Sequence, residues 1–286
     1  MKISTEIGSG ALLVGEERAV EYVAKAGFDA WDFSMFAMCG YDWANGCALP
    51  NKDHPLMGHD YLAFARRLKQ IGLDHGIVCT QSHAPFPTGC AEIRSLAKRA
   101  IECTAEAGGQ ICIIHPDNDS SPERNAEMYL ELLPFAKEHG VKIAAENMWN
   151  WDPVKEEASF AACATPESFL AHLEAVADPY LVACLDIGHA EMRGCGTTAV
   201  EMIHALGGHL QALHIHDNDL RLDSHQIPFS MKIDFVPIVQ ALKEIGYSGY
   251  FTLEADQYLP KYAKDDVLAG YRELAAAARR LAEMYQ

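Results

Sequence analysis

Eight short apolar runs recur along the chain, and each is followed by a polar loop and a longer amphipathic stretch. The runs are nearly continuous in hydrophobic residues, which is typical of parallel strands buried on both faces. The pattern therefore predicts strands at residues 2–8, 28–34, 76–82, 110–115, 141–147, 181–187, 210–216 and 249–255.

Helix signals fall between the predicted strands. Ser121 and Thr165 each precede a proline and a glutamate, the pattern of an N-cap, a proline at the first position and an acid in the first turn. Asp234 is placed to cap the next amphipathic stretch. Glycines stand where helices should end before the following strand, at positions 27, 72, 140 and 246.

Eight strand-then-helix units in 286 residues predict an α/β fold, a closed (β/α)₈ TIM barrel that forms one domain over residues 1–286. The alternative is a doubly wound open sheet. It is less favoured, because no Gly-x-Gly-x-x-Gly or phosphate-binding loop follows the first predicted strand.

Composition and charge narrow the class of protein. With 49% hydrophobic residues the chain is not disordered, and its longest apolar run, residues 180–185, is far below the roughly 18 residues of a membrane span. The first ten residues lack the pattern of a secretory signal, and the nine cysteines form no Cys-x-x-Cys pair. We therefore expect reduced thiols and a cytoplasmic location. The net charge of −17 disfavours a nucleic-acid partner.

Ionisable side chains stand at the ends of seven predicted strands. In a parallel barrel these ends share one rim, where functional groups gather. Several carboxylates buried together are costly unless a cation compensates them, and carboxylates with imidazoles are ligands of Zn²⁺, Mn²⁺ or Fe²⁺. The sequence thus predicts a divalent-metal site on this rim. The side chains are Asp32, His83, His115, Glu146, Asp186, His214 with His216, and Glu254, and His189 follows the sixth strand.

Each of these residues alone also has a structural explanation. A single histidine at a strand end is more often a hydrogen-bonded structural residue, and His189 fits a cap of the following turn. The joint pattern favours a metal centre that uses Glu146, Asp186 and Glu254. His214 and His216 lie on the same strand face by the period of two, so periodicity leaves open which one is the ligand.

At these residues the chain resembles the xylose-isomerase-like barrel superfamily over essentially its whole length. This group contains sugar and sugar-phosphate isomerases and epimerases, inosose dehydratases and the endonuclease IV type of apurinic-site nuclease. The segments that carry the resemblance are 146–147, 185–189, 214–217, 223–225 and 246–254.

The resemblance implies a metal held by Glu146, Asp186, His214 and Glu254, and the His-x-x-Asp form of 214–217 favours His214 over His216. It also implies that Glu146 and Glu254 are the catalytic acid/base pair and that His189 contacts a substrate oxygen. The nuclease branch implies further ligands, up to three metals in all. The matching positions are His83, His115, His189, Asp223 and His225, with His216 as an additional metal or substrate candidate.

The chain departs from the superfamily after His225. A Pro-Pro-Gly-x-Gly stretch is usual there, whereas this chain has bulkier, more apolar residues at 226–231. We expect a different pocket wall and no phosphate contact at this place. Isolated cations, Arg221 and Lys232, are the remaining phosphate candidates.

Aromatic residues crowd the loops of the predicted rim, at Trp31, Phe36, Tyr41, Trp43, Trp149 and Trp151. Such rings commonly stack on sugars or cyclitols. We take Trp43, Trp149, Trp151 and Lys232 as substrate-binding candidates, and an unphosphorylated sugar or cyclitol as the favoured substrate.

The predicted function is a divalent-metal-dependent sugar or polyol isomerase or epimerase that transfers a proton next to a metal-bound carbonyl. The metal is expected to be Zn²⁺ or Mn²⁺, with Co²⁺ and Mg²⁺ as alternatives. The competing hypotheses are an endonuclease IV-like nuclease with a multi-zinc centre, an inosose-type dehydratase and a non-catalytic metal-binding or sugar-sensing barrel. A homo-oligomer that associates through the outer helices is compatible with the sequence.

Overall fold

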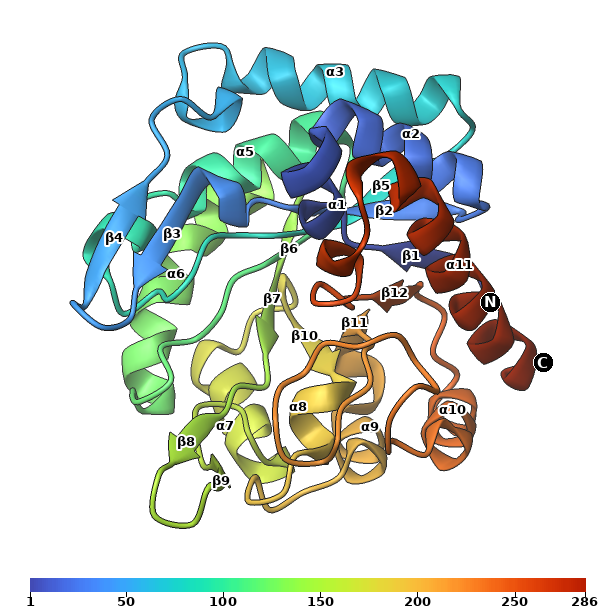
Figure 1. The fold of residues 1–286 in the computed structure, drawn as a ribbon. Helices are drawn as coiled ribbons and strands as arrows, with labels where there is room; N and C mark the ends of the chain where they lie inside the picture. The colour runs from blue at the N-terminus through green and yellow to red at the C-terminus, as the bar shows by residue number, and fades with distance from the viewer.

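Parallel strands lie at the centre of the protein and helices surround them, in a computed structural model that describes residues 1–286 (Figure 1). All eight predicted strands are present, most of them shorter than the apolar runs. They are β1 (Ile3–Thr5), β2 (Ala30–Ser34), β5 (Val78–His83), β6 (Ile111–Ile113), β7 (Lys142–Glu146), β10 (Leu181–Asp186), β11 (Leu210–His214) and β12 (Phe251–Leu253).

The strand ladders are continuous over only part of the predicted barrel. Six strands form one parallel sheet in the order β11-β10-β7-β6-β5-β2, and β1 pairs with β12 in a separate two-stranded sheet. Single bridges, Glu6 with Asp32 and Ile215 with Leu253, link the two sheets on either side. The expected eight-stranded ladder is therefore reduced to single bridges on both sides of the β1–β12 pair.

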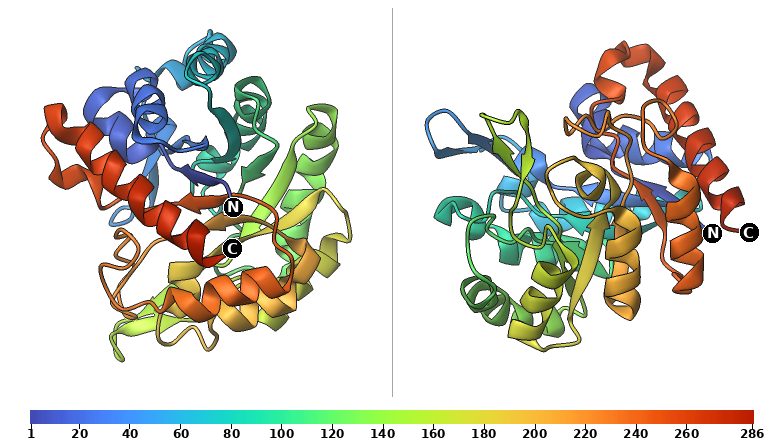
Figure 2. Two further views of the ribbon diagram at one scale, coloured as in Figure 1. Left: turned by 90° about the vertical axis from the view of Figure 1, so that its right-hand side faces the viewer. Right: turned by 90° about the horizontal axis from the view of Figure 1, so that it is seen from below.

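Helices cover the outside of the strands, as both views of Figure 2 show. Ser121, Thr165 and Asp234 accept hydrogen bonds from backbone amides as the N-caps of α6, α7 and α10, as predicted. The helices are α1 (Gly8–Val14), α2 (Glu16–Ala26), α3 (Tyr61–Asp74), α4 (Ala91–Arg94), α5 (Ala97–Ala107), α6 (Pro122–Glu138), α7 (Pro166–Val176), α8 (Ile187–Glu191), α9 (Ala199–Leu206), α10 (Phe235–Glu244) and α11 (Val267–Met284). No helix combines the length and the apolarity that a bilayer crossing requires.

The hydrophobic core lies between the helices and the outer faces of the strands, where 70 buried residues form one cluster. Trp31 belongs to this core and is fully buried, so its predicted place among the rim aromatics is wrong. It points outward from β2 and packs against Gly72 of α3, where a Cβ would come within 2.9 Å of its indole nitrogen. Only glycine permits this close approach.

Two antiparallel hairpins extend the loops that follow β2 and β7, and neither was predicted from the sequence. The first consists of β3 (Cys39–Asp42) and β4 (Cys47–Pro50), the second of β8 (Asn150–Asp152) and β9 (Glu157–Ser159). Strands of three or four residues with mixed polarity give no clear period-two signal. Both hairpins project from the same side of the barrel (Figures 1 and 2).

Candidate metal centre

The ends of five strands bring ionisable side chains to one place in the barrel. His83, Glu146, Asp186 and His214 are the last residues of β5, β7, β10 and β11, and Glu254 directly follows β12. All five are buried. Because the strands run parallel, their carboxyl ends share one rim, as the sequence predicted.

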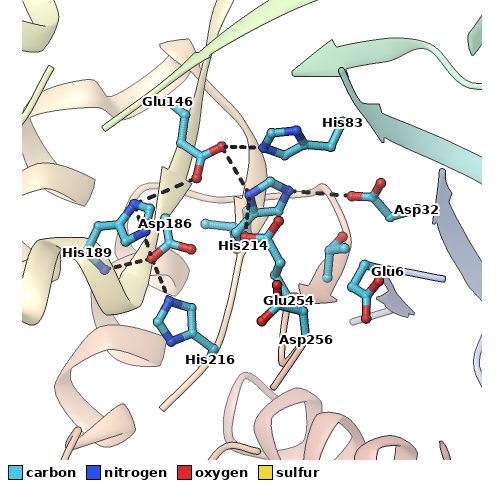
Figure 3. Close-up of polar contacts among 12 residues, drawn as sticks. Glu6, Asp32, His83, Glu146, Asp186, His189, His214, His216, Glu254 and Asp256 are labelled. Atoms are coloured by element: carbon cyan, nitrogen blue, oxygen red, sulfur yellow. Dashed lines mark hydrogen bonds and ion pairs between the residues drawn. The ribbon is translucent and has the colours of Figure 1, made fainter. Parts of the chain in front are cut away.

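Four of these five residues form a first cluster, here called the inner cluster: Glu146, Asp186, His214 and Glu254. One potential ligand atom from each residue lies within 4.8 Å of those of the others. His214 Nδ1 is 3.2 Å from Glu146 Oε2 and 3.2 Å from Glu254 Oε2 (Figure 3). This is the set of residues that the family resemblance implied.

A second group, here called the rim cluster, consists of His189, His216, Asp223 and His225. Asp223 is its centre, because its Oδ2 is 3.2 Å from His189 Nε2 and 3.1 Å from His225 Nε2. His216 Nε2 lies 3.4 Å from Asp223 Oδ1 and 3.1 Å from Asp186 Oδ1, so it connects the two clusters. His214 and His216, which periodicity could not separate, thus lie in different clusters.

His83 and His115 also face Glu146. His83 Nε2 is 3.5 Å and His115 Nε2 is 3.3 Å from Glu146 Oε2. Potential ligand atoms of His83, His115 and Glu146 also lie within 4.8 Å of one another, close enough to hold one ion. All ten predicted catalytic and metal-ligand candidates therefore lie in one connected network.

The orientation of the imidazoles fits a bound cation. The Nδ1 atoms of His83, His189 and His225 lie 2.7–2.9 Å from backbone carbonyl oxygens, so each Nδ1–H donates to a carbonyl. The Nε2 lone pairs then point at carboxylates. Two lone pairs facing each other repel unless a proton or a metal ion lies between them, and this arrangement is usual behind metal-bound histidines.

Buried polar atoms without a hydrogen-bond partner also fit a bound cation. Glu146 Oε2, Asp186 Oδ2, His214 Nδ1 and His216 Nε2 are buried and make no hydrogen bond. Buried polar groups are normally paired, since leaving one unpaired costs about 1–3 kcal/mol. Four such atoms within two adjoining clusters are explained together by divalent cations. The residues of both clusters therefore fit a metal.

His214 is held in the opposite sense to the other histidines. Its Nε2 faces Asp32 Oδ2 at 3.5 Å, so its Nδ1 is the atom that points into the inner cluster. The amide of Gln81 donates to the same Asp32 oxygen at 2.8 Å. A carboxylate behind a ligand histidine fixes the ring and makes it a better donor, which is the arrangement seen here.

The charges in the clusters displace the pKa values of their members. Burial alone would raise the pKa of Glu146, but His214 and His115 hold it well below its usual range. Burial and the nearby Glu146 keep the pKa of Glu254 well above its usual range, although His214 acts against this. Burial would lower the pKa of His189, yet Asp186 and Asp223 raise it to about 10. The protons held by Glu254 and His189 are the ones that a cation would displace on binding, whereas Glu146 is already ionised.

A cavity of about 770 Å³ opens onto both clusters. Trp43, Trp149 and Trp151 line it, as predicted, together with Phe36 and Tyr41. The metal and catalytic candidates that reach its surface are His83, His115, Glu146, His189, Asp223, His225 and Glu254, whereas Asp186, His214 and His216 lie below the wall.

Some predicted contacts are not brought to the cavity. Lys232 is exposed and does not line it, and Arg221 is bound to Glu156 through the backbone carbonyl and the carboxylate. The segment 226–231 also stays away from the cavity, because Phe229 packs on Phe235 instead. The segment therefore forms no part of the wall of this cavity, and the expected difference from the pocket wall of the superfamily stays a prediction.

Sequence reasoning missed several residues of the site. Asp256 lines the cavity two residues after Glu254, so the period of two could have indicated it. Glu6 is buried just beyond β1 and completes the set of strand-end acids. The loop and hairpin residues Asp117, Asn118, Asp119 and Asn150 carry no strand signal, and only the fold places them at the cavity.

The chain is similar in sequence to two curated proteins. It is 29% identical over 210 residues to "Uncharacterized protein MJ1311" of Methanocaldococcus jannaschii, which covers 67% of this chain and 69% of that protein. It is 26% identical over 200 residues to "Uncharacterized protein y4fM" of Sinorhizobium fredii, which covers 66% of this chain and only 60% of that protein. The chain thus matches less than two thirds of the length of y4fM.

Solved structures share the fold along the whole chain. A D-tagatose 3-epimerase-like protein has a TM-score of 0.69 at 22% identity, covering 99% of each chain. D-psicose 3-epimerase of Clostridium cellulolyticum H10 has a TM-score of 0.70 at 16% identity, covering 100% of each. The 3-keto-D-glucoside 4-epimerase YcjR of E. coli has a TM-score of 0.68 at 16% identity, covering 98% of this chain and 99% of that one.

The family comparison spans nearly the whole chain. Residues 20–281 match the family described as xylose isomerase-like TIM barrel. The motifs at the strand ends and the shared fold agree with this match, and the chain belongs to the xylose isomerase-like TIM barrel family.

Proposed function

We propose that the protein is a divalent-metal-dependent isomerase or epimerase of sugars or polyols, with its metal in the inner cluster. The observation that carries the proposal is the pair Glu146 and Glu254, whose carboxylates approach the same nitrogen of His214 from β7 and from the end of β12. Both also line the cavity. The names of the structural neighbours, which are sugar 3- and 4-epimerases, support this choice.

In this proposal each residue of the inner cluster has a defined task. Asp186 and His214 lie below the cavity wall and hold the cation, while Glu146 and Glu254 both hold it and face the substrate. When bound, a divalent cation polarises a substrate carbonyl and makes the adjacent C–H more acidic. Zn²⁺ and Mn²⁺ suit this set of three carboxylates and one imidazole, and Co²⁺ or Mg²⁺ are alternatives.

The two glutamates move the proton. One of them takes the proton from the carbon beside the carbonyl, and the other returns one. Return to the opposite face of the same carbon gives epimerisation, and return to the neighbouring carbon gives aldose–ketose isomerisation. His189, which lines the cavity beside Glu146, is placed to bind a substrate oxygen. Loss of a hydroxide after the first step would give the dehydratase reaction instead.

A second candidate function rests on the rim cluster and on the His83–His115–Glu146 group. Together with the inner cluster they offer three metal-ready sites, which suits an apurinic-site nuclease that activates water between several zinc ions. The cavity lining and the total charge oppose it. None of the residues that line the cavity is a lysine or an arginine, and the chain carries a net charge of −17.

The proposal also includes the domain organisation, the cellular location and the substrate class. We treat residues 1–286 as one domain and the eight strands as one closed barrel, because single bridges connect the two sheets on both sides. All nine cysteines are free, which supports the expected cytoplasmic location. The substrate is taken to be a small sugar or cyclitol.

Metal content and proton exchange test the proposal together. Protein purified without chelator is expected to hold about one Mn²⁺, Co²⁺ or Zn²⁺ per chain by elemental mass spectrometry. In heavy water it should exchange deuterium into a ketose or an inosose, detected by NMR. Two or three Zn²⁺ per chain with cleavage of abasic-site DNA would favour the nuclease. Failure to take up any metal on titration would refute both.

A further inference from the structure

We propose that the cavity takes an uncharged sugar that carries a second ring, with one ring beside the inner cluster and the other between the two hairpins. The inference rests on the proposed function for the chemistry of the first ring. It adds the size and the charge of the substrate.

An inner group of aromatic side chains touches the histidines of the metal centre. The ring of Phe36 lies 4.6 Å from that of His83, and the ring of Phe86 lies 4.9 Å from that of His115. Trp149 lies 6.4 Å from His189 and donates its indole N–H to Asp223 at 3.2 Å. These three rings therefore form the walls of a first subsite directly over the proposed metal ligands.

An outer group of aromatic side chains comes from the two hairpins. Tyr41 and Trp43 form an edge-to-face pair with 4.8 Å between ring centres, and Trp151 comes from β8. The guanidinium of Arg221 lies over the Trp151 ring at 5.8 Å. Trp43 is 69% exposed and Trp151 is 38% exposed although both line the cavity. Rings of this kind left open to water beside a polar site are typical of surfaces that stack on sugars.

The volume of the cavity agrees with two subsites. Pockets of about 300–1,000 Å³ enclose ligands of drug size, and 770 Å³ lies in the upper part of that range. A single hexose has only about a dozen non-hydrogen atoms and would leave the hairpin end filled with water. A second ring occupies the space between Trp43 and Trp151.

The charges of the lining exclude an anionic extension. Six carboxylates line the cavity, at Asp117, Asp119, Glu146, Asp223, Glu254 and Asp256, and no lysine or arginine does. Arg221 is bound to Glu156. At the outer end a phosphate or carboxylate group on the substrate would meet the field of the six acids of the cavity and only one cation nearby, Arg221, whose charge is already paired with Glu156, whereas hydroxyl groups can donate to the acids and amides there.

Binding measurements with matched sugars test this inference. Isothermal titration of Mn²⁺-loaded protein would compare D-fructose with isomaltulose and lactulose, two neutral ketoses that carry a second ring at different oxygens. Fructose 6-phosphate carries a charge where isomaltulose carries its ring. We expect at least one two-ring ketose to bind about tenfold tighter than fructose, and the phosphate to bind no tighter than fructose. Equal affinity for one and two rings, or preference for the phosphate, would overturn the inference.

Substitutions in and beside the second hairpin test where the second ring binds. Trp151→Ala should remove most of the gain from the second ring, so that the ratio of the two affinities falls toward one. Phe160→Ala is the matched control, because Phe160 follows β9, is 61% exposed and does not line the cavity. It should keep the ratio of the unmodified protein. If both variants keep the ratio, the hairpins do not bind the second ring and the inference fails.

Deuterium exchange separates this inference from the proposed function. Exchange into fructose without any gain from a second ring would overturn the inference and leave the proposed function in place. Tight binding of a two-ring ketose without exchange into any ketose would support the inference and contradict the proposed chemistry.

Discussion

Two buried glutamates of the same barrel have opposite surroundings. Glu6, just beyond β1, accepts hydrogen bonds from the Ser9 amide at 2.9 Å, from the Ser9 hydroxyl and from the Ser34 hydroxyl at 3.3 Å. Glu146, at the end of β7, has one oxygen without any hydrogen bond, and nitrogens of His83, His115 and His214 face that oxygen. Both residues are nearly inaccessible to solvent.

The difference is the reason for proposing Glu146, and not Glu6, as a metal ligand. Hydroxyl and amide donors satisfy Glu6, so it needs no cation. Imidazole nitrogens, which can offer lone pairs, surround Glu146, and a shared cation is what stabilises such a group. Asp32 stands between the two cases, since it receives a hydrogen bond from Gln81 and also faces a nitrogen of His214.

The largest effect is expected for Glu146→Gln. The substitution keeps the shape but removes a ligand charge and a proton-transfer group, so deuterium exchange into the substrate should fall by about a thousandfold. Metal content, measured by elemental mass spectrometry, should fall with it. Glu244→Gln is the control, because Glu244 is exposed and pairs only with surface groups on α9 and α10. Full activity of Glu146→Gln would remove the distinction between Glu146 and Glu6.

Asp32→Asn should have the next largest effect, through His214 rather than through the substrate. Without the carboxylate behind its Nε2, the His214 ring loses its preferred orientation, and metal affinity should fall by about ten- to a hundredfold. A competition titration with a metal-sensitive dye measures this change. Excess metal should restore the exchange rate, which distinguishes a positioning role from general damage to the fold. An exchange rate that stays low at saturating metal would argue against this role.

Asp223→Asn tests whether the rim cluster takes part in the chemistry. Asp223 accepts from the indole N–H of Trp149 and faces His189 Nε2, and if it only orients these two side chains the exchange rate should fall by only about tenfold. The number of bound metal ions per chain should be measured on the same sample. A loss as large as that of Glu146→Gln, together with loss of a bound ion, would move the catalytic centre toward a multi-metal mechanism.

The site residues differ in how well they could be predicted from the sequence. Glu146, Asp186 and Glu254 could be predicted because they stand at the ends of apolar runs, and the ends of parallel strands must meet. Periodicity alone could not decide which cluster His214 and His216 join, because both follow the same period of two, and only the family resemblance favoured His214 for the inner cluster. The two hairpins and the acids at 117 and 119 depend on loop packing, which leaves no periodic signal.

The smallest effect on chemistry, and a distinct effect on stability, is expected for Glu6→Gln. Burial raises the pKa of Glu6 from 4.5 to about 7, Asp256 and Asp32 add to this, and the Ser9 hydrogen bonds oppose it. The folded protein therefore binds a proton that the unfolded chain has lost between these two values. The contribution of Glu6 to the free energy of unfolding is full below pH 4.5 and falls as the pH rises toward 7.

Glutamine does not titrate, so the stability of Glu6→Gln relative to the unmodified protein should increase between pH 5 and pH 8, by up to about 3 kcal/mol. Denaturant unfolding at both pH values, with a chelator present in all samples, measures this difference without a contribution from metal release. Metal content and deuterium exchange should match the unmodified protein, because hydroxyl and amide groups rather than imidazoles surround position 6. A stability difference that is the same at both pH values would mean that Glu6 is already ionised in the folded protein. The hydrogen bonds from Ser9 and Ser34 would then compensate the charge of Glu6 fully, without a cation.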